Sequence, residues 1–214
     1  MTQHLFDRMM DIPALLARFD QIKSFSLLGS QSPAQMTQLQ KELKALGTDI
    51  RNGLHQWKSE WADTYPNGQA KEVRPVQGDT LPTFQCRDPT TGEIIYPAVF
   101  GYPDPVLAQA MCHYYAAHIL VLSVDTLPWD AASIRKIYDF ACLICRSMDY
   151  YIRTVPICLT ARVGFPFRVV YDALPDGSVE RKYVEQVFSV ISSSRISTEW
   201  DQCLTAVSVP QSYS

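Results

Sequence analysis

The spacing of apolar residues predicts helices over most of the 214-residue chain. A first helix is expected to begin near Asp11, whose side chain can cap it, and to end at Gly29. A second helix is expected from Ser32-Pro33 to Trp61, because apolar residues recur there every three or four positions. This stripe consists of Met36, Leu39, Leu43, Leu46, Ile50, Leu54, Trp57 and Trp61.

The stripe on the second helix is narrow and needs a partner to cover it. In one interpretation the first helix packs against it as an antiparallel hairpin. In the other, two copies of the chain form a coiled coil. Gly47 and Gly53 favour the hairpin, because each would weaken an exposed helix by about 1 kcal/mol. Residues 11–61 are therefore expected to form an N-terminal helical hairpin.

The helical pattern stops between residues 62 and 103, which contain six prolines and four glycines. Within this stretch, residues 88–93 (DPTTGE) have the composition of a turn. Apolar residues flank the turn, with Phe84 before it and Ile94 to Tyr96 after it. We expect a short β-hairpin here, within a long loop or arm that covers residues 62–103.

The most apolar helix is expected directly after Pro105. It is apolar on most of its faces, which is typical of a helix at the centre of a bundle. Its long apolar run, residues 108–124, is interrupted by polar side chains and is predicted to be a buried helix rather than a membrane span. Asp130 is expected to cap the next helix, which ends at Pro156.

Three further helices are expected near the C-terminus, at about residues 158–173, 178–194 and 199–207. The first of them should bend at Gly164 or Pro166. Together with the two before them, they would form a helical core over residues 104–207. The whole chain, 1–214, is predicted to be a single all-α domain of about seven helices, arranged as a multi-helix bundle or as an α-solenoid-like array.

The composition supports a folded core and argues against a nucleic-acid-binding surface. Hydrophobic residues make up 47% of the chain and charged residues 19%, which is enough apolar material for a sizeable core. The formal net charge is -3, and Lys and Arg are scattered without a run of three. We therefore expect no direct contact with nucleic acid and no membrane partner. The N-terminus also lacks the pattern of a secretory signal.

Two cysteines and two histidines are spaced closely enough to be candidates for redox chemistry or metal binding. Cys142 and Cys145 have the spacing of a redox or metal motif, but they lie well inside a predicted helix and have no second pair, so two core cysteines are favoured over metal binding. His113 and His118 are five residues apart, which places them on different helix faces, and core histidines are favoured. No metal, no cofactor and no catalytic residue is predicted.

Arginines close to the most apolar helices offer a different chemistry. A guanidinium beside tyrosines can bind an acidic small molecule through two parallel hydrogen bonds. We take Arg146, Tyr150, Phe165 and Arg168 as the candidate ligand-binding residues. The alternative is that the arginines cap helix ends or extend to the surface.

Five stretches carry a resemblance to a known family: PTFQCRDPTTGE (82–93), YPDP (102–105), YAAHIL (115–120), ICRSMDY (144–150) and FPFRVV (165–170). In order and spacing they cover about residues 30–195. The chain resembles the fungal-specific regulatory domain, the helical region C-terminal to the zinc binuclear cluster in many fungal transcription factors. The resemblance rests mainly on the ICRS and FPFR segments taken together.

The resemblance implies an all-α fold, action in the nucleus and control of transcription, often of metabolic genes. The partners would be proteins of the transcription machinery or a second copy of the chain, with a small-molecule effector. The zinc cluster that normally lies upstream is absent from this sequence, so DNA binding is not carried over. We expect the C-terminal part of a longer factor, a truncated gene product or a stand-alone relative.

A second hypothesis is that the chain is a stand-alone helical protein that binds a small molecule, or an enzyme. It would act in the cytoplasm, with a pocket between the helices of residues 104–173. Its basis is the arginine, tyrosine and cysteine content of that region.

Overall fold

The computed structural model of the chain describes residues 1–28, 33–76, 78, 80–88, 90–125 and 130–206. The described helices are α1 (Thr2–Met9), α2 (Ile12–Leu28), α3 (Pro33–Trp57), α4 (Pro105–Asp125), α5 (Ala131–Thr154), α6 (Gly164–Ala173) and α7 (Val179–Ala206). A π-helical turn, Lys58–Ala62, extends α3, and a 3₁₀ helix, Ile157–Val163, precedes α6. The predicted all-α fold of about seven helices is confirmed.

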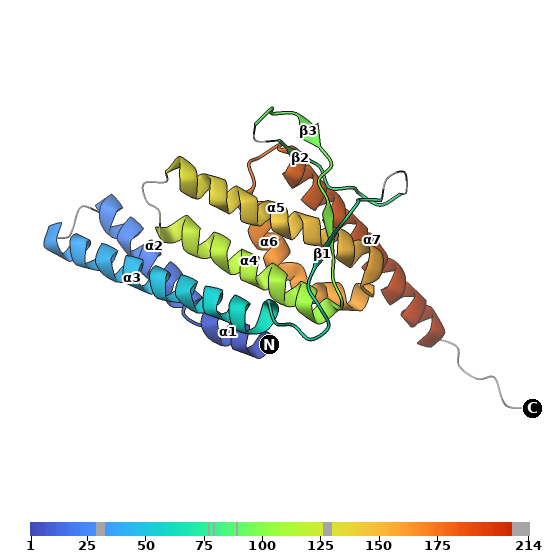
Figure 1. The fold of residues 1–214 in the computed structure, drawn as a ribbon, viewed down its shortest axis with the longest axis horizontal. Coiled ribbons are helices and arrows are strands. Elements are labelled where there is room, and N and C mark those ends of the chain that lie inside the picture. Colours follow the sequence, from blue (N-terminus) through green and yellow to red (C-terminus); the bar gives the residue numbers. More distant parts are fainter. Residues whose placement is uncertain (29–32, 77, 79, 89, 126–129, 207–214) are drawn as a thin grey trace, which may run out of the picture.

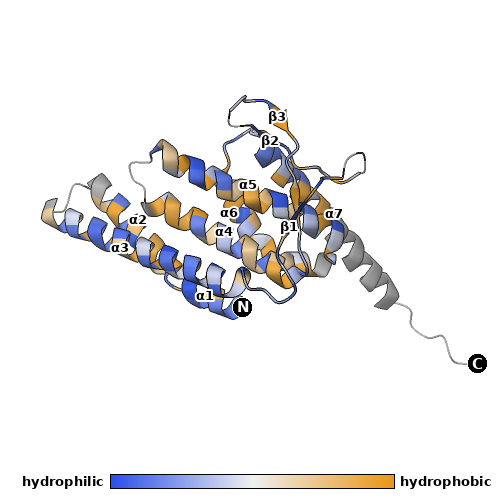
Figure 2. Ribbon diagram, viewed as in Figure 1, coloured by the Kyte–Doolittle hydropathy of each residue, from blue (hydrophilic) through white to orange (hydrophobic). Residues whose placement is uncertain are grey.

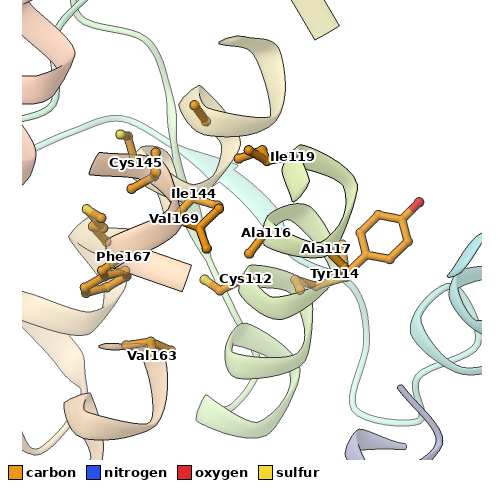
Figure 3. Packing of buried hydrophobic residues seen from close by; sticks show 14 of the residues in the cluster. Cys112, Tyr114, Ala116, Ala117, Ile119, Ile144, Cys145, Val163, Phe167 and Val169 are labelled. Carbon is orange, nitrogen blue, oxygen red and sulfur yellow. The ribbon is translucent and has the colours of Figure 1, made fainter. Parts of the chain in front are cut away.

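Helix α4 occupies the centre of the molecule (Figure 1), with α1, α2 and α3 on one side and α5 and α6 on the other. Small residues allow α4 to approach α5 and α6 closely. Ala116 and Cys112 of α4 face Ile144 of α5 and Phe167 and Val169 of α6 (Figure 3). In Figure 2 the colouring of α4 is largely apolar but is interrupted by hydrophilic positions. A helix covered on most faces needs no continuous polar side.

By length and composition, residues 105–124 of α4 are apolar enough to cross a membrane. Most of that stretch is buried against the other helices of the chain. The pattern is that of a core helix, as the polar interruptions in the sequence indicated.

The apolar stripe of α3 is covered within the chain. Leu43, Ile50, Leu54 and Trp57 are buried, and α3 packs against α1, α2 and α4. Burial of the stripe therefore does not require a second copy of the chain. Trp61 lies on the π-helical turn, is partly exposed and stacks on the ring of His4 at 4.5 Å between centroids.

Two short antiparallel strand pairs occupy the segment between α3 and α4. The predicted hairpin is confirmed: β2 (Cys86–Arg87) pairs with β3 (Ile94–Ile95). The Asp88 carboxylate accepts hydrogen bonds from the amides of Thr90 and Thr91, and Gly92 adopts a φ of 73° that favours glycine. A second pair, β1 (Lys71–Val73) with β4 (Val99–Gly101), was not predicted.

The structure corrects the predicted helices at both ends of the chain. The first eight-residue helix, α1, was missed, although its Leu5 is fully buried. The expected break between 194 and 199 is wrong, because α7 runs without interruption from Val179 to Ala206. That span contains neither Gly nor Pro, and its serines weaken a helix by only a few tenths of a kcal/mol each.

Other predicted helix signals agree with the structure. Asp130 caps α5 by accepting a hydrogen bond from the Ser133 amide at 2.6 Å. The expected bend falls at Gly164, where the 3₁₀ helix gives way to α6. The turn expected at residues 127–129, the last residues of the chain and the helix end expected at Gly29 lie outside the described residues.

Candidate ligand-binding site

A large cavity lies where the β2–β3 hairpin meets the first half of α5, the end of α6 and the start of α7. We call it the hairpin cavity. Its volume is about 1080 Å³, which is ample for a small organic molecule. Apolar side chains from α5, Ile134 and Ile137, face Leu174 and Pro175 of the α6–α7 turn across it. Ile134 is 51% exposed, which is high for a large apolar residue and marks this wall as open.

A buried carboxylate lies at the base of the hairpin cavity. Glu180 belongs to the first turn of α7, which begins after Ser178. Only 2% of the Glu180 surface is exposed. Its Oε1 accepts hydrogen bonds from the hydroxyl of Tyr138 at 2.7 Å and from the amide of Arg87 at 2.8 Å. Desolvation alone would raise the pKa of Glu180, but these hydrogen bonds lower it below its usual value. The group is therefore charged at neutral pH.

Arginines and acids form the rim of this cavity. Arg181 pairs with Asp176 and lies 4.0 Å above the Tyr171 ring. Arg135 donates from Nε to Asp139 at 2.9 Å and covers the ring of Tyr138. These pairs are partly exposed, so they contribute little to stability, but they place both signs of charge around an apolar interior.

The four residues predicted to bind a ligand lie in different surroundings. Arg146 of α5 is 17% exposed and holds the β1–β4 pair: its Nε donates to the Ala98 carbonyl at 2.5 Å and its Nη2 to Glu72 at 2.5 Å. Its guanidinium also lies 4.0 Å from the Phe100 ring centre. Tyr150, one turn further, is buried against Tyr102 and Tyr151.

The two candidates on α6 face elsewhere. Arg168 is 71% exposed and pairs with Asp172 at 2.8 Å. Phe165 is partly exposed and stacks on His113 of α4. None of the four borders the hairpin cavity. The structure does not bring them together around this space, and ligand binding by them stays a prediction.

The buried thiols and the two imidazoles of α4 are poorly suited to nucleophilic or acid–base chemistry. Burial raises the pKa of Cys112 and of Cys142 to about 12 and that of Cys145 well above its usual value. Burial also lowers the pKa of His113 and His118. Among the described residues, no group of three or more His, Cys, Asp or Glu side chains could hold a metal ion.

Sequence reasoning missed the residues that define the hairpin cavity. It placed the turn of residues 88–93 and the helix that begins after Asp130, which form two sides of the cavity. It did not single out Tyr138 or Glu180, because a carboxylate in the first turn of a helix is usually exposed. The only available signal was the proximity of an acidic residue to a predicted helix start.

Comparison with known proteins adds no relative. No protein-family model matches the chain, no curated protein matches it, and no solved structure matches it. What the fold and the cavity define is a helical domain with a space large enough for a small ligand.

Proposed function

We propose that this chain is a regulatory and interaction domain like that of fungal transcription factors, and that the hairpin cavity binds its small-molecule effector. In this proposal it acts in the nucleus, controls transcription of metabolic genes, and works through partners in the transcription machinery or a second copy. The observation that carries the proposal is the cavity of about 1080 Å³, with an apolar wall and a buried carboxylate at its base.

The segments that carry the family resemblance support this proposal by their positions. Residues 82–93 include β2 and most of the turn of the hairpin that closes one side of the cavity. Residues 144–150 lie on α5 and residues 165–170 on α6, two helices that pack against each other in the core. A ligand between the hairpin, α5 and α7 would therefore touch elements that belong to the family-like region.

The chemistry of the cavity favours binding over catalysis. Glu180 is charged and accepts hydrogen bonds, whereas the neighbouring Cys142 thiol is protonated at neutral pH because burial raises its pKa to about 12. We propose that the effector is a largely apolar molecule whose hydrogen-bond donor or amine approaches Glu180. The apolar body would lie on Ile134, Ile137 and Leu174.

The second hypothesis, a stand-alone binding protein or an enzyme in the cytoplasm, uses the same cavity. It shares the ligand but not the transcriptional output. The two are separated by measuring binding and transcription with the same variants.

Two half-exposed isoleucines provide a matched pair of variants. Ile134 (51% exposed) borders the cavity, and Ile94 (49% exposed) lies on β3 and does not border it. We expect a thermal-shift screen of metabolites to yield a ligand whose stabilisation is lost in Ile134→Trp, which fills the cavity, and kept in Ile94→Trp. Fused to a heterologous DNA-binding module in a fungal reporter strain, the wild-type domain should change transcription when this ligand is added.

Each outcome has a consequence for the proposal. Loss of the ligand-dependent transcription in Ile134→Trp alone would support it. Binding without any change in transcription would favour the stand-alone hypothesis. A ligand that binds Ile134→Trp as well as wild type would place the effector elsewhere and overturn the assignment of this cavity.

A further inference from the structure

A second cavity, which we call the histidine groove, lies on the other side of α5. It has a volume of about 610 Å³ and is bordered by α3, α4 and α5. Arg51 and His55 of α3 line it at a spacing of four residues, so both side chains project from the same helix face. Lys136 of α5 borders it from the opposite side. Two cationic side chains and one imidazole therefore line the histidine groove, which the proposed effector does not occupy.

The floor of the groove contains an imidazole with an unused hydrogen-bonding atom. His118 of α4 is 2% exposed, and its Nε2 has no hydrogen-bond partner among the residues that the structure describes. Its ring stacks on Phe140, with centroids 4.7 Å apart, and lies 4.9 Å from the ring of His55. A buried polar atom without a hydrogen-bond partner destabilises the fold, so a group that accepts from Nε2 would recover stability on binding.

The protonation state of His118 fits a donor. Burial, with smaller contributions from His55 and Arg51, lowers its pKa to about 3, so the ring is neutral at neutral pH. A neutral imidazole carries one N–H, and Nε2 can donate it to an oxygen. The His55 ring is held by a 3.3 Å contact between its Nδ1 and the Tyr114 hydroxyl.

The charges on the walls select for a negative ligand. Arg51, whose Nη2 donates to Thr48 Oγ1 at 3.3 Å, and Lys136 are the permanent cations. Asp139 is the acidic side chain that borders the groove, and Arg135 offsets its charge through the 2.9 Å ion pair. Leu122 and Leu143 add apolar surface beside Phe140.

We infer that the histidine groove binds a small molecule with one oxyanion group, a carboxylate or a phosphate, attached to a short apolar body. The oxyanion accepts from His118 Nε2 and pairs with Lys136 and Arg51, and the apolar body lies on Phe140 and Leu143. This site is separate from the hairpin cavity, and its failure would leave the proposed effector site unaffected.

The test measures the binding of three anions and one neutral probe to the full chain. Binding is detected by changes in the NMR chemical shifts of the isotope-labelled protein. Benzoate and phenyl phosphate should bind and shift the His118 ring signals, and inorganic phosphate should bind more weakly because it lacks the apolar body. Methyl benzoate, which is neutral, should not bind. The tighter of the two aromatic anions identifies the preferred group as carboxylate or phosphate.

Matched variants localise the binding. Lys136→Gln should weaken the aromatic anion at least fivefold, whereas Lys41→Gln, an exposed lysine of α3 that does not border the groove, should leave its affinity unchanged. His118→Phe should also weaken it, and Lys41→Gln controls for the general effect of removing one positive charge. Equal binding of methyl benzoate, equal effects of the two lysine variants, or no binding of either aromatic anion at millimolar concentration would overturn the inference.

Discussion

The two faces of the first half of α5 border cavities of opposite character. One face places Ile134, Ile137 and Tyr138 in the hairpin cavity. The other places Lys136, Phe140 and Leu143 in the histidine groove. Each cavity contains a buried polar group at its base: Glu180 in the first and His118 in the second.

The difference between the two buried groups is in how the fold satisfies them. Glu180 receives hydrogen bonds from Tyr138 and from the Arg87 amide, so the protein itself stabilises its charge. His118 Nε2 makes no hydrogen bond with the described residues. A satisfied buried group ties elements together, whereas an unsatisfied one gains stability only when something binds. The comparison predicts different responses to mutation, pH and ligand on the two faces.

The largest effect is expected from removing the hydroxyl that holds Glu180. Tyr138→Phe leaves the buried carboxylate without this donor, and we expect the free energy of unfolding to fall by about 2 to 3 kcal/mol. Urea unfolding at neutral pH measures it. Tyr96→Phe is the control, because Tyr96 is half-exposed and its hydroxyl only accepts a bond from Gln85. Equal unfolding midpoints for the two variants would contradict this account of Glu180.

The pH dependence of stability tests His118. In the unfolded chain an imidazole takes up a proton below its ordinary pKa of 6.5, whereas in the folded chain the pKa is lowered to about 3. His118 should therefore stabilise the fold fully above pH 6.5 and progressively less as pH falls. Its contribution should drop by about 2 kcal/mol between pH 7 and pH 5. The comparison of wild type with His118→Phe isolates this share, because other titrating groups remain. Parallel curves of stability against pH for wild type and His118→Phe would contradict the prediction.

The smallest effect on stability is expected from Arg135, which lies between the two cavities. Its removal should also change the affinity of the histidine groove for an anion. Arg135→Ala removes an exposed ion pair, so unfolding should change by less than about 0.5 kcal/mol. Asp139 then keeps its full charge beside the groove, and the affinity for benzoate should fall about threefold. Asp139→Asn should raise the affinity. This prediction depends on the anion site, and an unchanged affinity in both variants would count against it.

Most of the helical fold could be predicted from apolar spacing and capping residues. Asp130, Pro156 and Gly164 each act locally, within one turn of the chain, and each marks a boundary that the structure confirms. The β1–β4 pair could not be predicted, because Lys71–Val73 and Val99–Gly101 are far apart in sequence and too short to show a pattern.

The candidate site was less accessible to sequence reasoning. Arg146 and Arg168 look alike in sequence, each close to apolar residues on a predicted helix. In the structure Arg146 is mostly buried between α5 and β4, and Arg168 extends into solvent. Burial and partner choice are set by elements distant in the chain, and the same holds for Glu180, whose partners lie 93 and 42 residues away.

The contacts made by Arg146 and Glu180 also bear on how fast the chain folds. They join residues 74 and 93 positions apart, whereas helical bundles that fold quickly depend mainly on local contacts. We expect the segment between α3 and α4 to close only after α5 and α7 have docked. Arg146→Ala should then accelerate unfolding and leave the folding rate unchanged in stopped-flow experiments. A slower folding rate would show instead that this segment belongs to the folding nucleus. The helical core would then form only together with the segment between α3 and α4.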